Sequence, residues 1–127
     1  MAVIKAFECI RPDEKVADRV AALPYDVYNR EEALNEVERE PLSFLAIDRA
    51  ETQFDSSVDT YADCVYDKAR ELLDSRIADG TFITDTDKAY YVYELTMNGR
   101  TQTGIAACAS IDDYSSSTAT AASSAAL

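Results

Sequence analysis

Histidine is missing from this 127-residue chain. Its absence excludes Ser-His and Cys-His nucleophile pairs, HExxH zinc sites and the commonest general base of enzymes. Glycine occurs only three times, and the chain has neither a GxxxxGKS/T segment nor a GxGxxG segment. No glycine-rich loop is therefore available to bind phosphate groups, and we do not expect the chain to be an enzyme on its own.

Cysteine is also scarce. The three residues, Cys9, Cys64 and Cys108, are odd in number and form no CxxC pair, so a disulfide framework or a thiolate zinc site is not expected. Each stands among apolar neighbours in the sequence, and unpaired cysteine is among the residue types most often buried. We predict three buried, inert thiols.

Basic residues are half as frequent as acidic ones, 12 against 24, which gives a net charge of −12. Such a surface repels a phosphate backbone, so nucleic-acid binding is not expected. The chain has no run of about 18 apolar residues, so the sequence predicts no membrane span. Lys5 and Glu8 interrupt the apolar residues near the N-terminus, which is not typical of a secretory signal, and we expect a cytoplasmic protein.

Three amphipathic helices are predicted, over residues 12–22, 30–39 and 59–79, because apolar residues recur at helical spacing in each. The third is the strongest, and we expect it to cover the core. Its predicted apolar face consists of Tyr61, Val65, Ala69, Leu72, Leu73 and Ile77.

The ends of these helices also have recognisable signals. Pro24 and Pro41 follow the first and second helices, and the residue before a proline is disfavoured in helical conformation. Gly80 follows the third helix, where glycine is the usual terminating residue. Asn29 and Glu32 have the spacing of a capping box, which predicts the start of the second helix.

Asn98-Gly99 lies between two β-favouring segments and predicts a hairpin over residues 88–112. Apolar residues occupy both faces of this hairpin, so we expect it to be largely covered. We expect residues 2–10 and 43–48 to join it as strands. The predicted fold class is therefore α+β, with an antiparallel or mixed sheet centred on the hairpin and covered by the three helices.

Two connecting segments and the C-terminal segment complete the prediction. Residues 49–57 are polar and predict a loop, and residues 81–84 predict a short strand. Residues 115–127 contain only Ser, Thr, Ala and one Leu, which is too little apolar surface to offset the entropy of ordering. We expect one α+β domain over 1–114, followed by a low-complexity tail.

Four segments resemble a known family in the same order along the chain. They are LPYDVYN (23–29), EPLSFLAID (40–48), VYDKARELL (65–73) and TMNGRTQTGIAACASIDDY (96–114). These segments resemble the N-terminal part of a group of prokaryotic proteins known as domain of unknown function family 1015. The resemblance covers residues 1–114, and it implies that this chain is the N-terminal portion of a longer architecture.

The resemblance also implies a function for full-length members. Their later Asp-Gly-His-His-Arg motif, absent here, looks like the phosphate-handling motif of ParB-like and free-serine-kinase proteins. It implies ATP- and Mg²⁺-dependent phosphorylation of a small hydroxylated, serine-like metabolite. Ala46 stands where many members have histidine, and Leu42 where tyrosine is frequent. We therefore expect this chain to be inactive alone, with its catalytic residues unassigned and no cofactor evident. The alternative is a non-catalytic ligand-sensing or protein-interaction domain.

Tyr25, Asp26 and Arg100 are the candidate ligand-binding residues. Asp26 either accepts backbone N–H bonds in a turn or offers its carboxylate to Mg²⁺ or a substrate amine. Tyr25 either packs against the hairpin or stacks on an adenine, and Arg100 is either a solvated turn residue or a phosphate contact. The expected partner is a small-molecule ligand, or another protein under the alternative function. A sheet without the strands of a longer protein would also keep an open edge for self-association.

Overall fold

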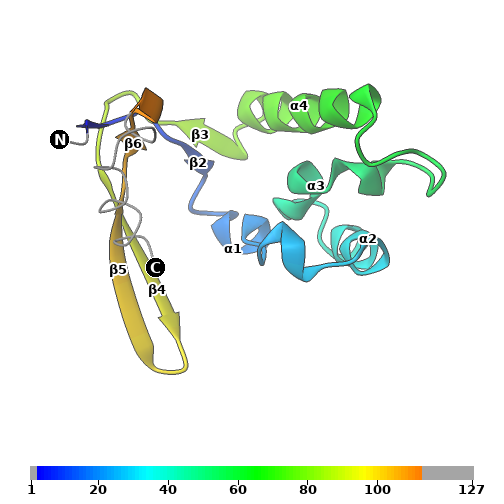
Figure 1. The fold of residues 1–127 in the computed structure, drawn as a ribbon, viewed down its shortest axis with the longest axis horizontal. Coiled ribbons are helices and arrows are strands. Elements are labelled where there is room, and N and C mark those ends of the chain that lie inside the picture. The colour runs from blue at the N-terminus through cyan, green and yellow to red at the C-terminus, as the bar shows by residue number, and fades with distance from the viewer. Residues whose placement is uncertain (1–2, 113–127) are drawn as a thin grey trace. The chain divides into compact units, whose positions relative to one another are not determined.

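The computed structural model describes residues 3–112, so the predicted tail over 115–127 lies outside the described residues. Its internal contacts separate two units, and each is described by itself (Figure 1). The helical unit is Ile10–Thr84, and the described part of the hairpin unit is residues 3–9 and 85–112. The α+β class is confirmed, because the chain combines helices with antiparallel strand pairs.

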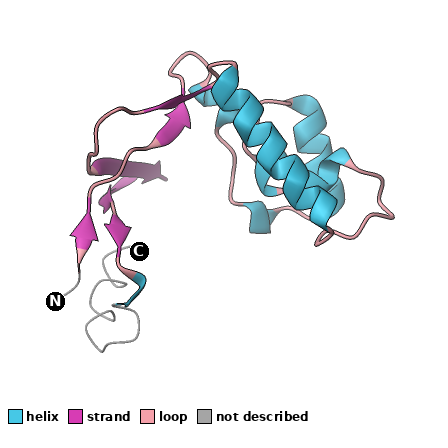
Figure 2. Ribbon diagram, turned by 90° about the horizontal axis from the view of Figure 1, so that it is seen from above, coloured by secondary structure: helices cyan, strands magenta, loops and turns pink. Residues whose placement is uncertain are grey.

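The helical unit consists of four α-helices, two 3₁₀ turns and one strand pair. In chain order these are β2 (Ile10–Pro12), α1 (Ala17–Val20), η1 (Tyr25–Val27), α2 (Arg30–Arg39), α3 (Leu45–Asp48), η2 (Ala50–Gln53), α4 (Asp63–Ala78) and β3 (Phe82–Thr84). β2 pairs antiparallel with β3, which confirms the strand predicted near residues 81–84. Figure 2 shows α4 lying along the shorter helices, and it contacts both α3 and η2.

The predicted helix ends are confirmed for α2 and α4. The Asn29 side chain accepts a hydrogen bond from the Glu32 amide, and the Glu32 carboxylate accepts one from the Asn29 amide, each at 2.9 Å. α4 ends at Ala78, followed by Gly80 at φ +83°, a conformation that glycine adopts without strain. No helix among residues 3–112 has both the length and the apolar character needed to cross a membrane.

The first predicted helix is much shorter than expected. It begins at Ala17 rather than near Pro12, because Pro12 pairs with Phe82 in the β2–β3 ladder. The next residue, Asp13, donates its amide to the Thr81 carbonyl at 2.9 Å, which keeps this segment beside the strand. Only four residues remain for the helix before the turn that leads to Pro24.

The strand predicted over residues 43–48 is wrong, because this segment forms the helix α3. Leu45 and Ala46 are 1% and 2% exposed, and they pack with Ala33 and Val37 of α2. A short apolar run fits a buried helical turn as well as a buried strand, so its periodicity could not decide between them. The 49–57 loop prediction is also wrong in part, because η2 occupies Ala50–Gln53 and its first three residues are buried.

The hairpin unit contains two antiparallel pairs. β4 (Tyr91–Met97) pairs with β5 (Arg100–Ala106), and β1 (Ile4–Lys5) pairs with β6 (Cys108–Ala109). Asn98 and Gly99 have φ values of +52° and +76°, the signature of a type I′ turn, which confirms the hairpin prediction. The described strands form three separate two-stranded pairs rather than the single sheet expected.

The expectation that the hairpin would be largely covered is wrong. Val92, Met97 and Ile105 are 75%, 74% and 76% exposed, and most other residues of the two strands are exposed too. Apolar residues on both faces imply coverage only where another layer packs on the sheet. The described part of the hairpin unit contains no α-helix that could supply this layer.

The prediction of three buried cysteines is also wrong. Cys9 is half-buried, whereas Cys64 and Cys108 are exposed. Cys64 lies in the first turn of α4 and Cys108 in a two-residue strand. Apolar neighbours in sequence do not share a direction in space on a helix or strand, so they were a poor guide to burial.

Arg76 of α4 connects this helix to the segment that precedes α3. Its guanidinium donates hydrogen bonds to the carbonyl oxygens of Pro41, Leu42 and Ser43 at 2.6, 3.1 and 3.2 Å. The residue is 5% exposed, and this burial lowers the pKa of Arg76 from its ordinary value. Arginine stays protonated in proteins, so a charged group is held here by backbone carbonyls.

Replacing Arg76 should therefore destabilise the helical unit. We expect Arg76→Met to lower the free energy of unfolding by about 3 kcal/mol, because three carbonyl oxygens lose their partner. Arg70→Met is the matched control, since the Arg70 side chain is 81% exposed on the same helix and should change stability little. Urea unfolding measures both, and equal effects of the two variants would contradict the structural role of Arg76.

Candidate functional site

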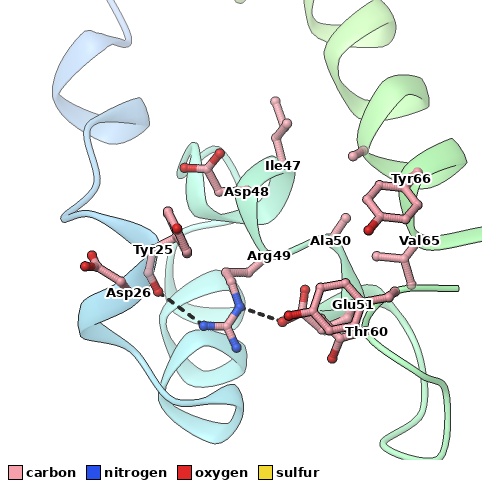
Figure 3. A pocket seen from close by; sticks show the side chains of 12 residues that line it. Tyr25, Asp26, Ile47, Asp48, Arg49, Ala50, Glu51, Thr60, Val65 and Tyr66 are labelled. Carbon is pink, nitrogen blue, oxygen red and sulfur yellow. Dashed lines mark hydrogen bonds and ion pairs between the residues drawn. The ribbon is translucent and has the colours of Figure 1, made fainter.

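A pocket of about 460 Å³ opens in the helical unit (Figure 3). Its floor is the junction between α3 and η2, and its two walls come from η1 and from the region where α4 begins. The lining residues are Tyr25 and Asp26 from η1, Ile47–Glu51 from the floor, and Thr60, Tyr61, Val65, Tyr66 and Ala69 from the second wall.

Arg49 fixes the position of the η1 wall against the floor. Its guanidinium donates hydrogen bonds to the carbonyl oxygens of Tyr25 and Tyr28, at 3.2 and 2.7 Å. The same group forms an ion pair with Glu51, with 2.5 Å between Nε and Oε1 (Figure 3). Glu51 is 2% exposed, so Arg49 compensates a buried carboxylate as well as two backbone carbonyls.

Three tyrosines line the pocket and leave much of their ring surface exposed. Tyr25, Tyr61 and Tyr66 are 59%, 77% and 57% exposed. Figure 3 places Tyr25 on one side of Arg49 and Tyr66 on the other, so the aromatic groups come from both walls. The floor and the adjoining wall add the small or branched apolar side chains of Ile47, Ala50 and Val65.

Two carboxylates, Asp26 and Asp48, lie on the Tyr25 side of the pocket (Figure 3). Within residues 3–112 no hydrogen bond or ion pair involves either carboxylate group. Although Asp48 is exposed, partial desolvation raises the pKa of its carboxyl above the ordinary value. Asp48 also ends α3, where the unpaired carbonyl groups of a helix disfavour a negative charge.

The sequence profile of a family described as "Protein of unknown function (DUF1015)" matches residues 4–120. The chain belongs to the DUF1015 family. The match includes both described units and continues past Tyr114 into the segment predicted as a tail. Searches of curated proteins and of solved structures gave no match to this chain.

The DUF1015 chain brings two of its three predicted ligand-binding residues together. Tyr25 and Asp26 are adjacent in η1 and both line the pocket. The alternative role of Asp26 in a turn is not observed, because its carboxylate accepts no backbone N–H bond within residues 3–112. Arg100 belongs to the hairpin unit, where it begins β5 and pairs with Met97, and the site described here contains residues of the helical unit alone.

Sequence reasoning missed four residues of this site: Asp48, Arg49, Tyr61 and Tyr66. Tyr61 was assigned to the buried face of the third helix, but α4 begins at Asp63, so Tyr61 precedes the helix and lies open to solvent. Tyr61, Val65 and Ala69 do share one side at spacings of four residues, and that side forms the pocket wall. This four-residue spacing was the one signal in the sequence that could have identified the second wall of the pocket. Ala46, where the resemblance suggests histidine, is a buried core residue.

ATP does not fit this pocket of the DUF1015 chain. Arg49 is the one cationic side chain among the described lining residues, and its guanidinium is already bound by Glu51 and two carbonyl oxygens. A triphosphate would face the Asp26 and Asp48 carboxylates without a cation to compensate it. Among residues 3–112, no group of three or more His, Cys, Asp or Glu side chains is placed to hold a metal ion.

The Arg49–Glu51 pair should be required for the stability of the pocket. We expect Arg49→Met to lower the free energy of unfolding by about 3 kcal/mol, because it leaves the Glu51 carboxylate buried without a partner. Combining it with Glu51→Leu removes the stranded charge and should recover much of the loss. Guanidinium chloride unfolding of the single and double variants tests this, and a double variant no more stable than Arg49→Met would contradict it.

Asp48→Asn should raise stability at neutral pH. The pKa of Asp48 lies above its ordinary value of 3.8, so its contribution to stability is fully present below that pH and is lost as pH rises through the raised pKa. Asparagine has no charge to desolvate. The free energy of unfolding of the variant should therefore exceed that of the unaltered protein only as pH rises. Urea unfolding at neutral pH and below pH 3.8 measures it. The control is Asp26→Asn on the exposed η1 turn, and an equal gain at both pH values would refute the assignment.

Proposed function

We propose that this DUF1015 chain is a non-catalytic domain that binds a small polar metabolite in the Tyr25–Tyr66 pocket. The observation that carries the proposal is the combination of three exposed tyrosines with two carboxylates that have no partner among residues 3–112, all around one cavity. Its volume of about 460 Å³ lies in the range of ordinary small-molecule sites.

The construction of the pocket supports binding rather than packing alone. A folded chain gains stability by burying aromatic rings, so three rings left around one cavity keep apolar surface in contact with water. Arg49 holds the floor through its ion pair with Glu51 and the η1 wall through backbone carbonyl oxygens, so the tyrosine side chains are not used for this purpose. The pocket is therefore formed in advance, which lowers the entropic cost of binding a ligand.

Phosphotransfer is the second candidate function, in which full-length members phosphorylate a hydroxylated, serine-like metabolite with ATP and Mg²⁺. The raised pKa of Asp48 beside the pocket favours it, because a carboxylate that binds protons more strongly is a better general base for a hydroxyl group. In that case the pocket would be the acceptor site. Because ATP does not fit the same pocket, the nucleotide would bind elsewhere, and this chain alone is expected to be inactive.

A fragment screen tests the binding function directly. With a library of neutral, cationic and anionic metabolite-sized compounds, we expect some to shift the NMR signals of Tyr25, Ala50 and Tyr66 selectively. Tyr66→Leu should weaken the binding of these compounds about fivefold or more, because a stacked or cation-binding ring is worth about 1 kcal/mol or more. Tyr93→Leu is the matched control, since Tyr93 is 58% exposed but lies in the hairpin unit. A library without any compound that shifts pocket signals would overturn the proposal.

The two candidate functions differ in an ADP assay. Incubation of this chain with ATP, Mg²⁺ and free serine should release no ADP above the rate without protein. A full-length family member would form ADP only under the phosphotransfer function. No turnover by that protein with a panel of hydroxylated amino acids and sugars would remove the second candidate and leave the binding function unaffected.

A further inference from the structure

We propose that the ligand of this pocket is a small organic cation, an amine or a quaternary ammonium compound that carries alkyl groups. The inference rests on the proposed binding function and adds the chemical class of the ligand. Three properties of the pocket support it, namely its aromatic rings, its charge and its apolar lining residues.

The aromatic rings provide the first argument. The face of a tyrosine ring carries negative electrostatic potential and attracts ammonium groups that approach within about 6 Å of its centre. Tyr25, Tyr61 and Tyr66 come from two different walls, and their hydroxyl groups make no hydrogen bond within residues 3–112. Tyrosine rings from two different walls therefore offer their surface to a cation that enters the cavity.

The charge of the lining provides the second argument. Three of the lining residues are acidic (Asp26, Asp48 and Glu51) and one is basic (Arg49), which leaves a formal charge of −2. The ion pair between Arg49 and Glu51 cancels two of the four charges, so the excess belongs to Asp26 and Asp48. A cation gains from both carboxylates, an anion is repelled, and the net charge of −12 on the whole chain draws cations towards it.

The apolar part of the lining distinguishes an organic cation from a metal ion. Ile47, Ala50, Val65 and Ala69 present hydrocarbon to the cavity, which suits methyl or methylene groups around a nitrogen. Mg²⁺ binds through oxygen ligands in octahedral geometry and keeps its water, so it gains little from aliphatic side chains and aromatic faces. The lining therefore fits an alkylated ammonium group better than a hydrated metal ion.

Choline and its uncharged isostere 3,3-dimethylbutan-1-ol test the inference, because they share a shape and differ in one charge. We expect choline to shift the NMR signals of Tyr25, Ala50 and Tyr66 with a Kd at least about tenfold below that of the alcohol. In the Asp26→Asn/Asp48→Asn double variant this preference should fall to about threefold or less. Asp74→Asn, an exposed carboxylate of α4 outside the pocket, controls for the loss of general negative charge and should retain the preference.

Each result either supports or overturns the inference. If the alcohol binds the pocket as tightly as choline, the cation assignment is overturned while the binding function stands. If fragments of other classes shift the pocket signals and choline does not, the cation assignment is likewise overturned and the binding function stands. A preference that survives unchanged in the double variant would overturn the role of the carboxylates and the inference with it. If no compound shifts any pocket signal, the proposed function fails as well.

Discussion

Arginine side chains bound to backbone carbonyl oxygens hold the helical unit together. Arg30 donates to the carbonyls of Val58, Asp55 and Glu51, while Arg49 and Arg76 secure the η1 turn and the segment before α3. The core offers little else, because three of its eight buried apolar residues are alanines. A small apolar core contributes limited burial energy, so segments without regular structure need other restraints. Guanidinium groups, each with five donors, provide them.

The candidate site depends on the same restraint. Arg49 is poorly placed to bind an anion, because Glu51 offsets its charge and its Nε and Nη1 atoms already donate to Glu51 and to the carbonyl oxygens of Tyr25 and Tyr28. The ion pair with Glu51 offsets the one positive charge among the lining residues and leaves the Asp26 and Asp48 carboxylates as the excess charge of the pocket. The interaction that builds the pocket thus also determines which charge the pocket favours. The Arg49 side chain therefore links the structure of the pocket to its selectivity for charge.

Local signals in the sequence predicted local structure well. The capping box of α2, the glycine after α4 and the Asn98-Gly99 turn each depend on residues within a few positions, and all three are confirmed. The helix at α3 and the role of Arg49 could not be predicted, because they depend on contacts with other elements: α3 packs on Ala33 and Val37 of α2, and Arg49 binds carbonyl oxygens more than twenty positions before it. The family signature located Tyr25 and Asp26. The opposite wall, with Tyr61 and Tyr66, faces them only after the chain has folded.

The placement of the three pocket tyrosines has an optical consequence. The chain has no tryptophan, so its near-ultraviolet absorption and emission come mainly from its eight tyrosines. Tyr25, Tyr61 and Tyr66 are three of these and surround one cavity, where solvent now reaches their rings. A molecule that enters the cavity replaces water around a large share of the chromophores of the protein. The unlabelled chain therefore carries its own fluorescence reporter, positioned by its fold at the place where a ligand would bind.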